Sequence, residues 1–464
     1  VPWYDEPIDP DDDEQLYKGR DPRDYVMQKV LEDLDFAATW CSKASKYVNT
    51  NVINRYVALA LKSRICLYEG TWRKYHGLDG SEEWLRACVA ASEELMGDSP
   101  YSLVSTAGEE TTNYSKVFKS EEPQYTEVIL ANEFNATLNR FHDASWYYAS
   151  GSYGQRNSGP KAFVNMYLNL DGTRFTDKDG YNKTQFKDEF AGRDYRLRQT
   201  FITPYYLKKV GGKETNEFAK VFPGLTTQLT YYRIIKWNTD DDANESNTSS
   251  ANSLPVFRYA EILLNEAEAK AELGTLTQDD LTISVNEIRN RVEMPALNMA
   301  EANKNPDWYL SSEEYGYPNV TGANKGVILE IRRERAVELI QEGFRLQDLY
   351  RWKAGYCIDQ DIFGMYFPGP GEYKLAGKET ADLILYKAGE TKPQAGEGVS
   401  VYELGSDIIL SEGDKGYVYY HKTVENQRPG FNEERDYLYP IPSGERSLNP
   451  NLTQNPGWSD GLDF

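Results

Sequence analysis

Histidine and cysteine are scarce in this chain, which has three His and four Cys among 464 residues. The cysteines lie far apart and form no C-x-x-C pair, so buried free thiols are expected, with a disulfide or a metal site as the alternatives. Motifs of zinc proteases, nucleophile elbows and phosphate-binding loops are also missing. We therefore expect no catalytic residues, no metal site and no cofactor. The four cysteines are Cys41, Cys66, Cys88 and Cys357.

Positive charge and long apolar runs are also in short supply. The chain has 51 Lys and Arg against 73 Asp and Glu, which gives a formal net charge of -22. Such a surface repels phosphates and anionic lipid headgroups, so nucleic acid is not expected as a partner. No apolar stretch approaches the roughly 20 residues that cross a bilayer. The opening residues read as an extended loop, and we expect sequence to be missing upstream of them.

Aromatic residues, in contrast, are abundant. The chain contains 35 Tyr and 9 Trp, and aromatic residues make up 13% of it. Flat rings with a polar tip suit ligands that are half apolar and half hydroxylated. With 40% hydrophobic and 27% charged residues, the chain can also bury a substantial core. The composition therefore predicts a globular protein suited to such ligands.

Helical periodicity occurs first in a block of about residues 13–96. Asp21 is expected to be the N-cap of a helix with apolar residues at every third or fourth position. A second helix is expected after Asn54, and a third after Ser81, which would end at Gly97 in the C′ position. Start signals about one helix plus a loop apart are typical of stacked helix pairs.

A second helical block covers about residues 254–356. Near its end, Gly343 separates a long helix from a short one, in which Arg345 and Arg351 lie three residues on either side of Asp348. This carboxylate is therefore expected to bridge both guanidinium groups, in a structural role. The longer helices of this block are predicted over residues 257–273, 281–292 and 326–341.

The remaining segments, about residues 97–253 and 357–464, are loop-rich. Apolar runs are short there, which predicts short strands at residues 127–130 and 231–235. Residues 240–253 are polar and predict an exposed loop, whereas the proline-rich end predicts an extended tail docked by its side chains. We therefore predict a mainly α fold, formed as a single unit in which a helical scaffold carries a loop-rich, short-strand region.

Several segments resemble the SusD/RagB family. The ending is the most distinctive, since residues 437–442 read YLYPIP and residues 448–458 read LNPNLTQNPGW. The resemblance covers nearly the whole chain and departs from the family at the start, where family members carry a lipoprotein signal, a lipidated cysteine and further helices. The other matching segments are DGTR at 171–174, RDYRL at 193–197, KWN at 236–238, RYAE at 258–261, EAEA at 266–269, NEIR at 286–289 and FRLQDLYRW at 344–352.

This resemblance implies a tetratricopeptide-like helical scaffold with a SusD-specific region of loops and short strands. It also implies an outward-facing lipoprotein of the outer membrane, attached only through an N-terminal lipid anchor that is absent from this chain. Family members bind an oligosaccharide or polysaccharide, or in some branches a peptide. They deliver it to a SusC-like TonB-dependent transporter without cleaving it.

The candidate glycan site lies in residues 140–157, where aromatic residues and glycines occur without helical or alternating periodicity, as in an exposed loop. Sugar C–H faces pack on aromatic rings, while Arg, Asn, Gln and Asp bind paired hydroxyl groups. Alternatively, Trp146 and Tyr148 fill the interface between the loop region and the scaffold. The predicted glycan-binding residues are Arg140, His142, Asp143, Trp146, Tyr147, Tyr148, Tyr153, Gln155, Arg156 and Asn157, together with Trp308 from a polar loop between two helices.

Two other classes of function compete with glycan capture. A glycoside hydrolase would also combine aromatic rings with acids, and it needs two carboxylates about 5 to 10 Å apart across the cleaved bond. With 73 acidic residues, some pair will satisfy that distance by chance. A helical-repeat adaptor would bind only proteins. A glycan-binding protein that sits on a transporter would also bind a protein, so the two classes overlap in part.

Overall fold

The computed structural model describes residues 1–149, 157–204, 206–216, 230–376, 379–419 and 430–462. Among these described residues, 38% are in helices and 12% in strands or isolated bridges, which confirms the prediction of a mainly α fold. Within the described ranges, no helix combines the length and the apolar character needed to span a membrane.

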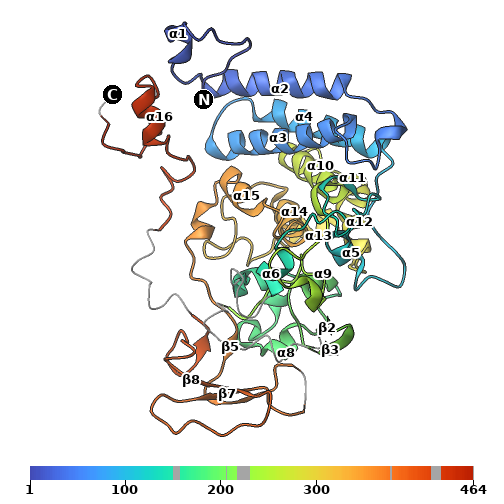
Figure 1. Cartoon of the computed structure of the whole chain (residues 1–464), viewed down its shortest axis with the longest axis vertical. Helices are drawn as coiled ribbons and strands as arrows, with labels where there is room; N and C mark the ends of the chain where they lie inside the picture. The colour runs from blue at the N-terminus through green and yellow to red at the C-terminus, as the bar shows by residue number, and fades with distance from the viewer. Residues whose placement is uncertain (150–156, 205, 217–229, 377–378, 420–429, 463–464) are drawn as a thin grey trace.

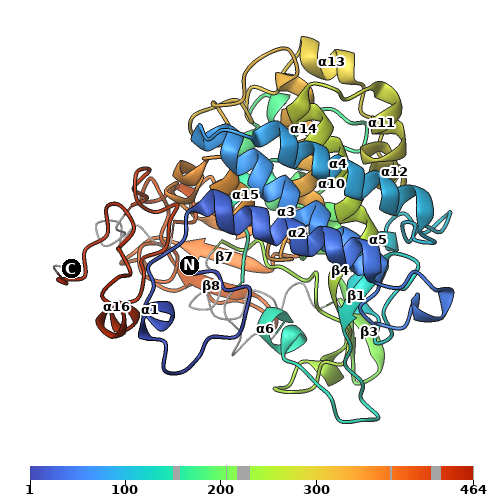
Figure 2. The same cartoon turned by 90° about the horizontal axis from the view of Figure 1, so that it is seen from above.

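Three long helices form a layer at one end of the molecule (Figures 1 and 2). They are α2 (Arg23–Trp40), α3 (Arg55–His76) and α4 (Ser81–Asp98), and α3 packs between the other two. As predicted, Asn54 caps α3, because its side-chain oxygen accepts the first free N–H groups of the helix. Beneath this layer, α10 (Tyr259–Leu273) packs against α3, α4 and α14.

Two predicted helix ends are wrong. Pro22 rather than Asp21 holds the N-cap position of α2, and the Asp21 carboxylate instead accepts the Trp3 N–H at 2.6 Å. Gly97 lies inside α4, which continues to Asp98. At Asp21, the contact with Trp3, outside the helix, outweighs a local capping preference of about 1 kcal/mol.

The second helical block contains α14 (Lys325–Glu338), which is buried from Gly326 to its end, and α15 (Arg345–Arg351). The helix expected over residues 281–292 is divided into α11 (Gln278–Ile283) and α12 (Val285–Asn290). The break is at Ser284, whose hydroxyl donates to the Asp280 carbonyl at 2.5 Å while its backbone leaves helical geometry.

Only short strands occur in the described part of the loop-rich region. The first pair, β1 (Val128–Asn132) with β4 (Leu254–Arg258), is antiparallel and joins that region to the start of α10. The strand predicted at 231–235 does not form: Arg233 and Ile234 make only isolated bridges, and Tyr231, at the start of the segment, has a φ of 69°, outside the extended region. The other strands are β2 (Leu207–Val210) with β3 (Lys213–Asn216), β5 (Tyr366–Phe367) with β9 (Gly416–Tyr417), and β6 (Gly371–Tyr373), β7 (Leu383–Tyr386) and β8 (Ser400–Glu403) in one sheet.

The segment of residues 240–253, predicted to be an exposed loop, is buried at its end. Residues 250–253 are buried, and Asn252 donates to the Phe118 carbonyl at 2.8 Å, so the prediction is wrong there.

Short helices and 3-10 turns complete the described elements. The short α-helices are α1 (Asp13–Leu16), α5 (Asn113–Lys119), α6 (Ala144–Ala149), α7 (Lys161–Val164), α8 (Phe186–Glu189), α9 (Tyr195–Thr200), α13 (Met299–Lys304) and α16 (Ser443–Leu448). The 3-10 turns include η1 (Ser45–Tyr47), η2 (Phe175–Asp177), η3 (Tyr181–Lys183), η6 (Asp242–Asn244) and η7 (Gly355–Ile358).

All four cysteines are free thiols. Cys66 and Cys88 are buried, as expected, and burial raises the pKa of Cys88 to about 12. Cys41 and Cys357 are only half-buried.

A buried cluster of ion pairs joins α14 to the loop-rich region. The Glu338 carboxylate accepts from Arg291 at 2.5 Å, from Arg258 at 2.7 Å and from Arg196 of α9 at 3.3 Å. All four side chains are at most 2% exposed. Burial alone would raise the pKa of Glu338, but these guanidinium groups hold it well below its usual value. Since an unpaired buried charge is very costly, the cluster fixes how these segments fit together.

The ion pairs predicted within α15 are only half right. Asp348 accepts from Arg351 at 2.9 Å, as expected, but its second partner is Arg335 of α14, also at 2.9 Å. Arg345 instead donates to the Tyr317 hydroxyl at 2.7 Å. Arg345 and Arg351 are six positions apart and so lie about 120° apart around the helix axis. Asp348 binds Arg351 and the neighbouring helix supplies its second partner, Arg335.

The C-terminal tail is not extended throughout, since α16 interrupts it. Its side chains dock on the N-terminal segment: Asn449 donates to the Lys18 carbonyl at 3.1 Å, and Arg20 donates to the Thr453 carbonyl at 3.0 Å. Figures 1 and 2 both show α16 beside α1. The two ends of the described chain are thus held together by side-chain bonds to backbone carbonyls.

Replacing Glu338 by Gln should destabilise the protein by about 3 to 5 kcal/mol, because an amide has no charge for three buried guanidinium groups and adds a donor facing them. Urea unfolding would measure this loss. The control, Glu301→Gln, removes an exposed carboxylate 3.9 Å from Lys304 and should change stability by less than about 0.5 kcal/mol. Equal losses in the two variants would contradict the structural role of the cluster.

Stability should also fall in acid through Glu268. Burial favours the neutral acid, but Arg351 and Arg335 outweigh it and lower the pKa of Glu268 to about 2. Because this folded pKa is below the unfolded value of about 4.5, the contribution is complete above pH 4.5 and is lost as pH falls toward 2, about 3 kcal/mol in all. In urea unfolding at stepped pH, Glu268→Gln should be less stable at pH 7 and lose less stability in acid. A parallel acid profile for the two proteins would rule this out.

Candidate functional site

The segment predicted to be an exposed loop contains a short helix. Residues 144–149 form α6, which carries Trp146, Tyr147 and Tyr148 as half-buried rings. The Tyr147 N–H donates to the Asp143 carbonyl at 2.8 Å and closes the first turn. A helix of six residues is less than two turns long, so it leaves no periodicity in the sequence.

His142 and Asp143 attach the start of α6 to residues 248–252. Nδ1 of His142 accepts the Ala144 N–H at 3.1 Å, so Nε2 carries the proton and donates to the Asn252 carbonyl at 2.7 Å. Burial lowers the pKa of His142, which keeps the ring neutral. The Asp143 carboxylate accepts the Thr248 N–H. Both side chains therefore position α6, and sugar contact by either stays a prediction.

Tyr148 faces the interior more than the solvent. Its hydroxyl donates to Gln341 at 3.0 Å, its carbonyl accepts from Arg233 at 2.8 Å, and its ring packs against two hydrophobic clusters. Burial raises the pKa of Tyr148. These contacts favour the alternative that Tyr148 fills the interface between the loop region and the scaffold.

Trp146 and Tyr147 form an edge-on pair, with ring centroids 5.0 Å apart and planes inclined by 73°. Arg140 has an exposed side chain and ends a tight turn in which its backbone pairs with Asn135. Asn157 is half-buried, and its carbonyl accepts the Ile234 N–H at 3.4 Å. The predicted residues Tyr153, Gln155 and Arg156 lie outside the described residues.

Trp308 belongs to a second aromatic cluster. Its ring is 47% exposed and packs edge-on against Tyr309 at 5.7 Å and Tyr181 at 6.1 Å, and its indole N–H donates to Asp177 at 2.9 Å. Tyr315 stacks on Tyr309 at 4.7 Å, whereas Tyr309 is itself buried. Tyr181 and Asp177 were not predicted from the sequence, because nothing in their local pattern indicates that they meet a tryptophan about 130 positions away.

The chain thus presents two partly open aromatic surfaces, one on α6 and one around Trp308. Aromatic faces of this kind pack against apolar C–H groups of a ligand. Among the residues that the structure describes, no group of three His, Cys, Asp or Glu side chains is arranged to hold a metal ion.

Comparison with known proteins gives consistent matches. The model of the SusD family matches residues 126–458. SusD-like protein P38 of Formosa agariphila is 31% identical over 141 residues, which are 30% of this chain but only 24% of that protein. The match therefore spans about a quarter of this relative.

Solved structures share the fold. A SusD-like protein from Bacteroides fragilis superposes with a TM-score of 0.64 at 18% identity, over 97% of this chain and 74% of that one. A SusD-like carbohydrate binding protein from the same species gives a TM-score of 0.62 at 19% identity, over 95% and 73% of the two chains. At these identities the likeness establishes the fold. Because the family model covers well over half of the residues, including most of the motifs noted in the sequence, the chain belongs to the SusD family.

Proposed function

We propose that this protein captures an oligosaccharide or polysaccharide at the outer face of the outer membrane and passes it intact to a SusC-like TonB-dependent transporter. The observation that supports this most is membership in the SusD family over residues 126–458. One solved relative with the same fold is itself a carbohydrate binding protein. A binder beside a transporter raises the local ligand concentration, and moderate affinity permits release into the pore.

The proposed contact surface is α6. Trp146 and Tyr147 are inclined by 73°, so they present two contact planes, which suits a chain of sugar rings that changes direction. His142 and Asp143 hold the helix to residues 248–252 through hydrogen bonds. A ligand would therefore meet rings whose positions are already set, and little conformational entropy would be lost on binding.

Binding without cleavage also fits the chemistry of this segment. Hydrolysis needs a carboxylic acid and a second carboxylate facing each other across the glycosidic bond. Asp143 is the only acid in residues 140–148, and its carboxylate accepts the Thr248 N–H. His142 is kept neutral by burial and has both ring nitrogens engaged with backbone groups. These groups are suited to positioning the helix rather than to acid–base catalysis.

Calorimetry with a panel of oligosaccharides should detect binding, and the double variant Trp146→Ala with Tyr147→Ala should weaken it at least tenfold, about 1.4 kcal/mol. Tyr148 is left intact because its ring packs against the core. The control Trp40→Ala removes an equally large ring that is 72% exposed on α2, and Trp308→Ala tests the second aromatic surface.

The same samples distinguish the competing functions when reducing ends are assayed after incubation. Heat without new reducing ends is the expected result. New reducing ends would indicate a hydrolase, and heat from peptides but not from glycans would indicate peptide uptake. Unchanged glycan affinity in the double variant would remove α6 from the binding site.

A further inference from the structure

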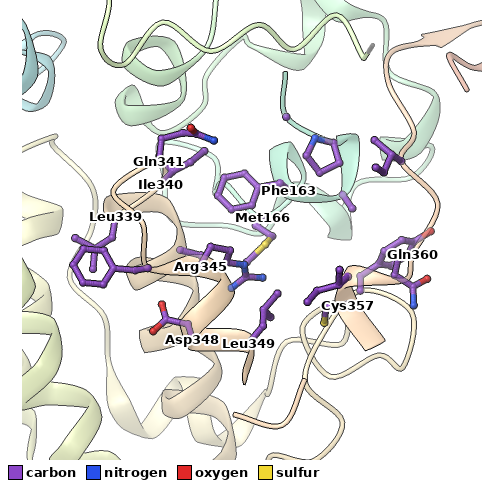
Figure 3. A pocket seen from close by; sticks show the side chains of 18 of the residues that line it. Phe163, Met166, Leu339, Ile340, Gln341, Arg345, Asp348, Leu349, Cys357 and Gln360 are labelled. Carbon is purple, nitrogen blue, oxygen red and sulfur yellow. The ribbon is translucent and has the colours of Figure 1, made fainter. Parts of the chain in front are cut away.

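A cavity of about 350 Å³ lies between α7, the end of α14, α15 and η7. Its volume is within the range of small-ligand sites in proteins. Most of its lining is apolar, with Phe163, Met166, Leu339 and Leu349 among the side chains that surround it in Figure 3. The predicted glycan residues do not line it, although Gln341 at its edge accepts the Tyr148 hydroxyl.

Arg345 brings a positive charge into this apolar space. Figure 3 shows its side chain reaching from α15 toward Met166, in the middle of the lining residues. Among the described residues, its guanidinium donates one hydrogen bond, to the Tyr317 hydroxyl at 2.7 Å. A guanidinium has five N–H donors, so most of the N–H groups of Arg345 do not bond to Tyr317.

The neighbouring arginines differ from Arg345 in having carboxylate partners. Arg335 pairs with Asp348, Arg351 pairs with Asp348 and Glu268, and Arg332 pairs with Glu272. Across the described part of the chain, no carboxylate lies within 4.0 Å of the Arg345 guanidinium. In Figure 3, Arg345 lies between Met166 and Asp348. A charged group without an ion partner beside apolar walls is the polar element expected of a ligand site rather than of a core.

The charges around the cavity restrict the ligand further. Glu314 and Asp361, the exposed acids of the lining, lie at its solvent side, and Asp361 accepts the Tyr419 hydroxyl at 2.5 Å. These acids and the net charge of -22 disfavour any ligand with several negative charges. One carboxylate that reaches Arg345 would gain a bidentate, charge-assisted pair.

We propose that this cavity binds a small monocarboxylate with an apolar ring or chain. Its carboxylate pairs with Arg345, and its apolar body packs against Phe163, Met166 and Leu349. This site is separate from the α6 surface and does not depend on the glycan-binding proposal.

The probes are 3-phenylpropanoate and hexanoate, each compared with its neutral amide, which has nearly the same shape. Calorimetry of the whole protein should show binding of at least one acid and at least tenfold weaker binding of its amide. Arg345→Gln should weaken acid binding at least tenfold. Arg198→Gln, which removes an exposed positive charge elsewhere on the chain, should leave it unchanged.

Arg345→Gln loses the bond to Tyr317 and so could misfold. A second variant therefore tests the cavity without changing Arg345. Ala162→Leu adds volume to the α7 wall of the cavity and leaves Arg345 in place, so it should weaken acid binding while thermal unfolding stays near wild type. Absence of binding by both acids, equal binding of acid and amide, or unchanged binding in both cavity variants would overturn the proposal.

Discussion

Glu338 pairs with three arginines that come from separate parts of the chain, and the surrounding structure is arranged around these buried contacts. Arg196 belongs to α9, Arg258 ends β4 and Arg291 follows α12. Because each of these charges would be costly to bury alone, the three segments must approach α14 together. The same helix end positions the α6 surface, since Gln341 lies three residues beyond Glu338 and accepts the Tyr148 hydroxyl. The Trp308 surface is held in a similar way, through Asp307, which pairs with Arg333 of α14 and with Arg174.

Local signals predicted the parts of the fold that depend on local chemistry. Asn54 starts α3 because its side chain is chemically suited to the free N–H groups beside it, and Gly274 ends α10 because it tolerates a φ of 76°. Asp21 has the same capping chemistry as Asn54, yet its carboxylate is used by the Trp3 N–H and by Lys18. Such competition between a local and a distant partner cannot be read from residue spacing.

The candidate site was predictable in composition but not in geometry. A density of rings near residues 140–148 is visible in the sequence, but the order of the segment is set from outside it. His142 depends on a carbonyl 110 positions away and Tyr148 on a side chain 193 positions away. The cavity beside α15 was hidden for a related reason, because Arg345 has the spacing of a helix ion pair and only the packing of α14 shows that Arg335 replaces it.

The protein therefore consists of a buried, ion-paired frame and of aromatic rings that this frame holds at the surface. Glycan capture is the function proposed for those rings. A crystal structure with a bound oligosaccharide tests that assignment most directly. The account predicts sugar rings lying against Trp146 and Tyr147 with every glycosidic bond intact. A sugar bound elsewhere while these two rings remain uncovered, or a cleaved product in the site, would contradict it.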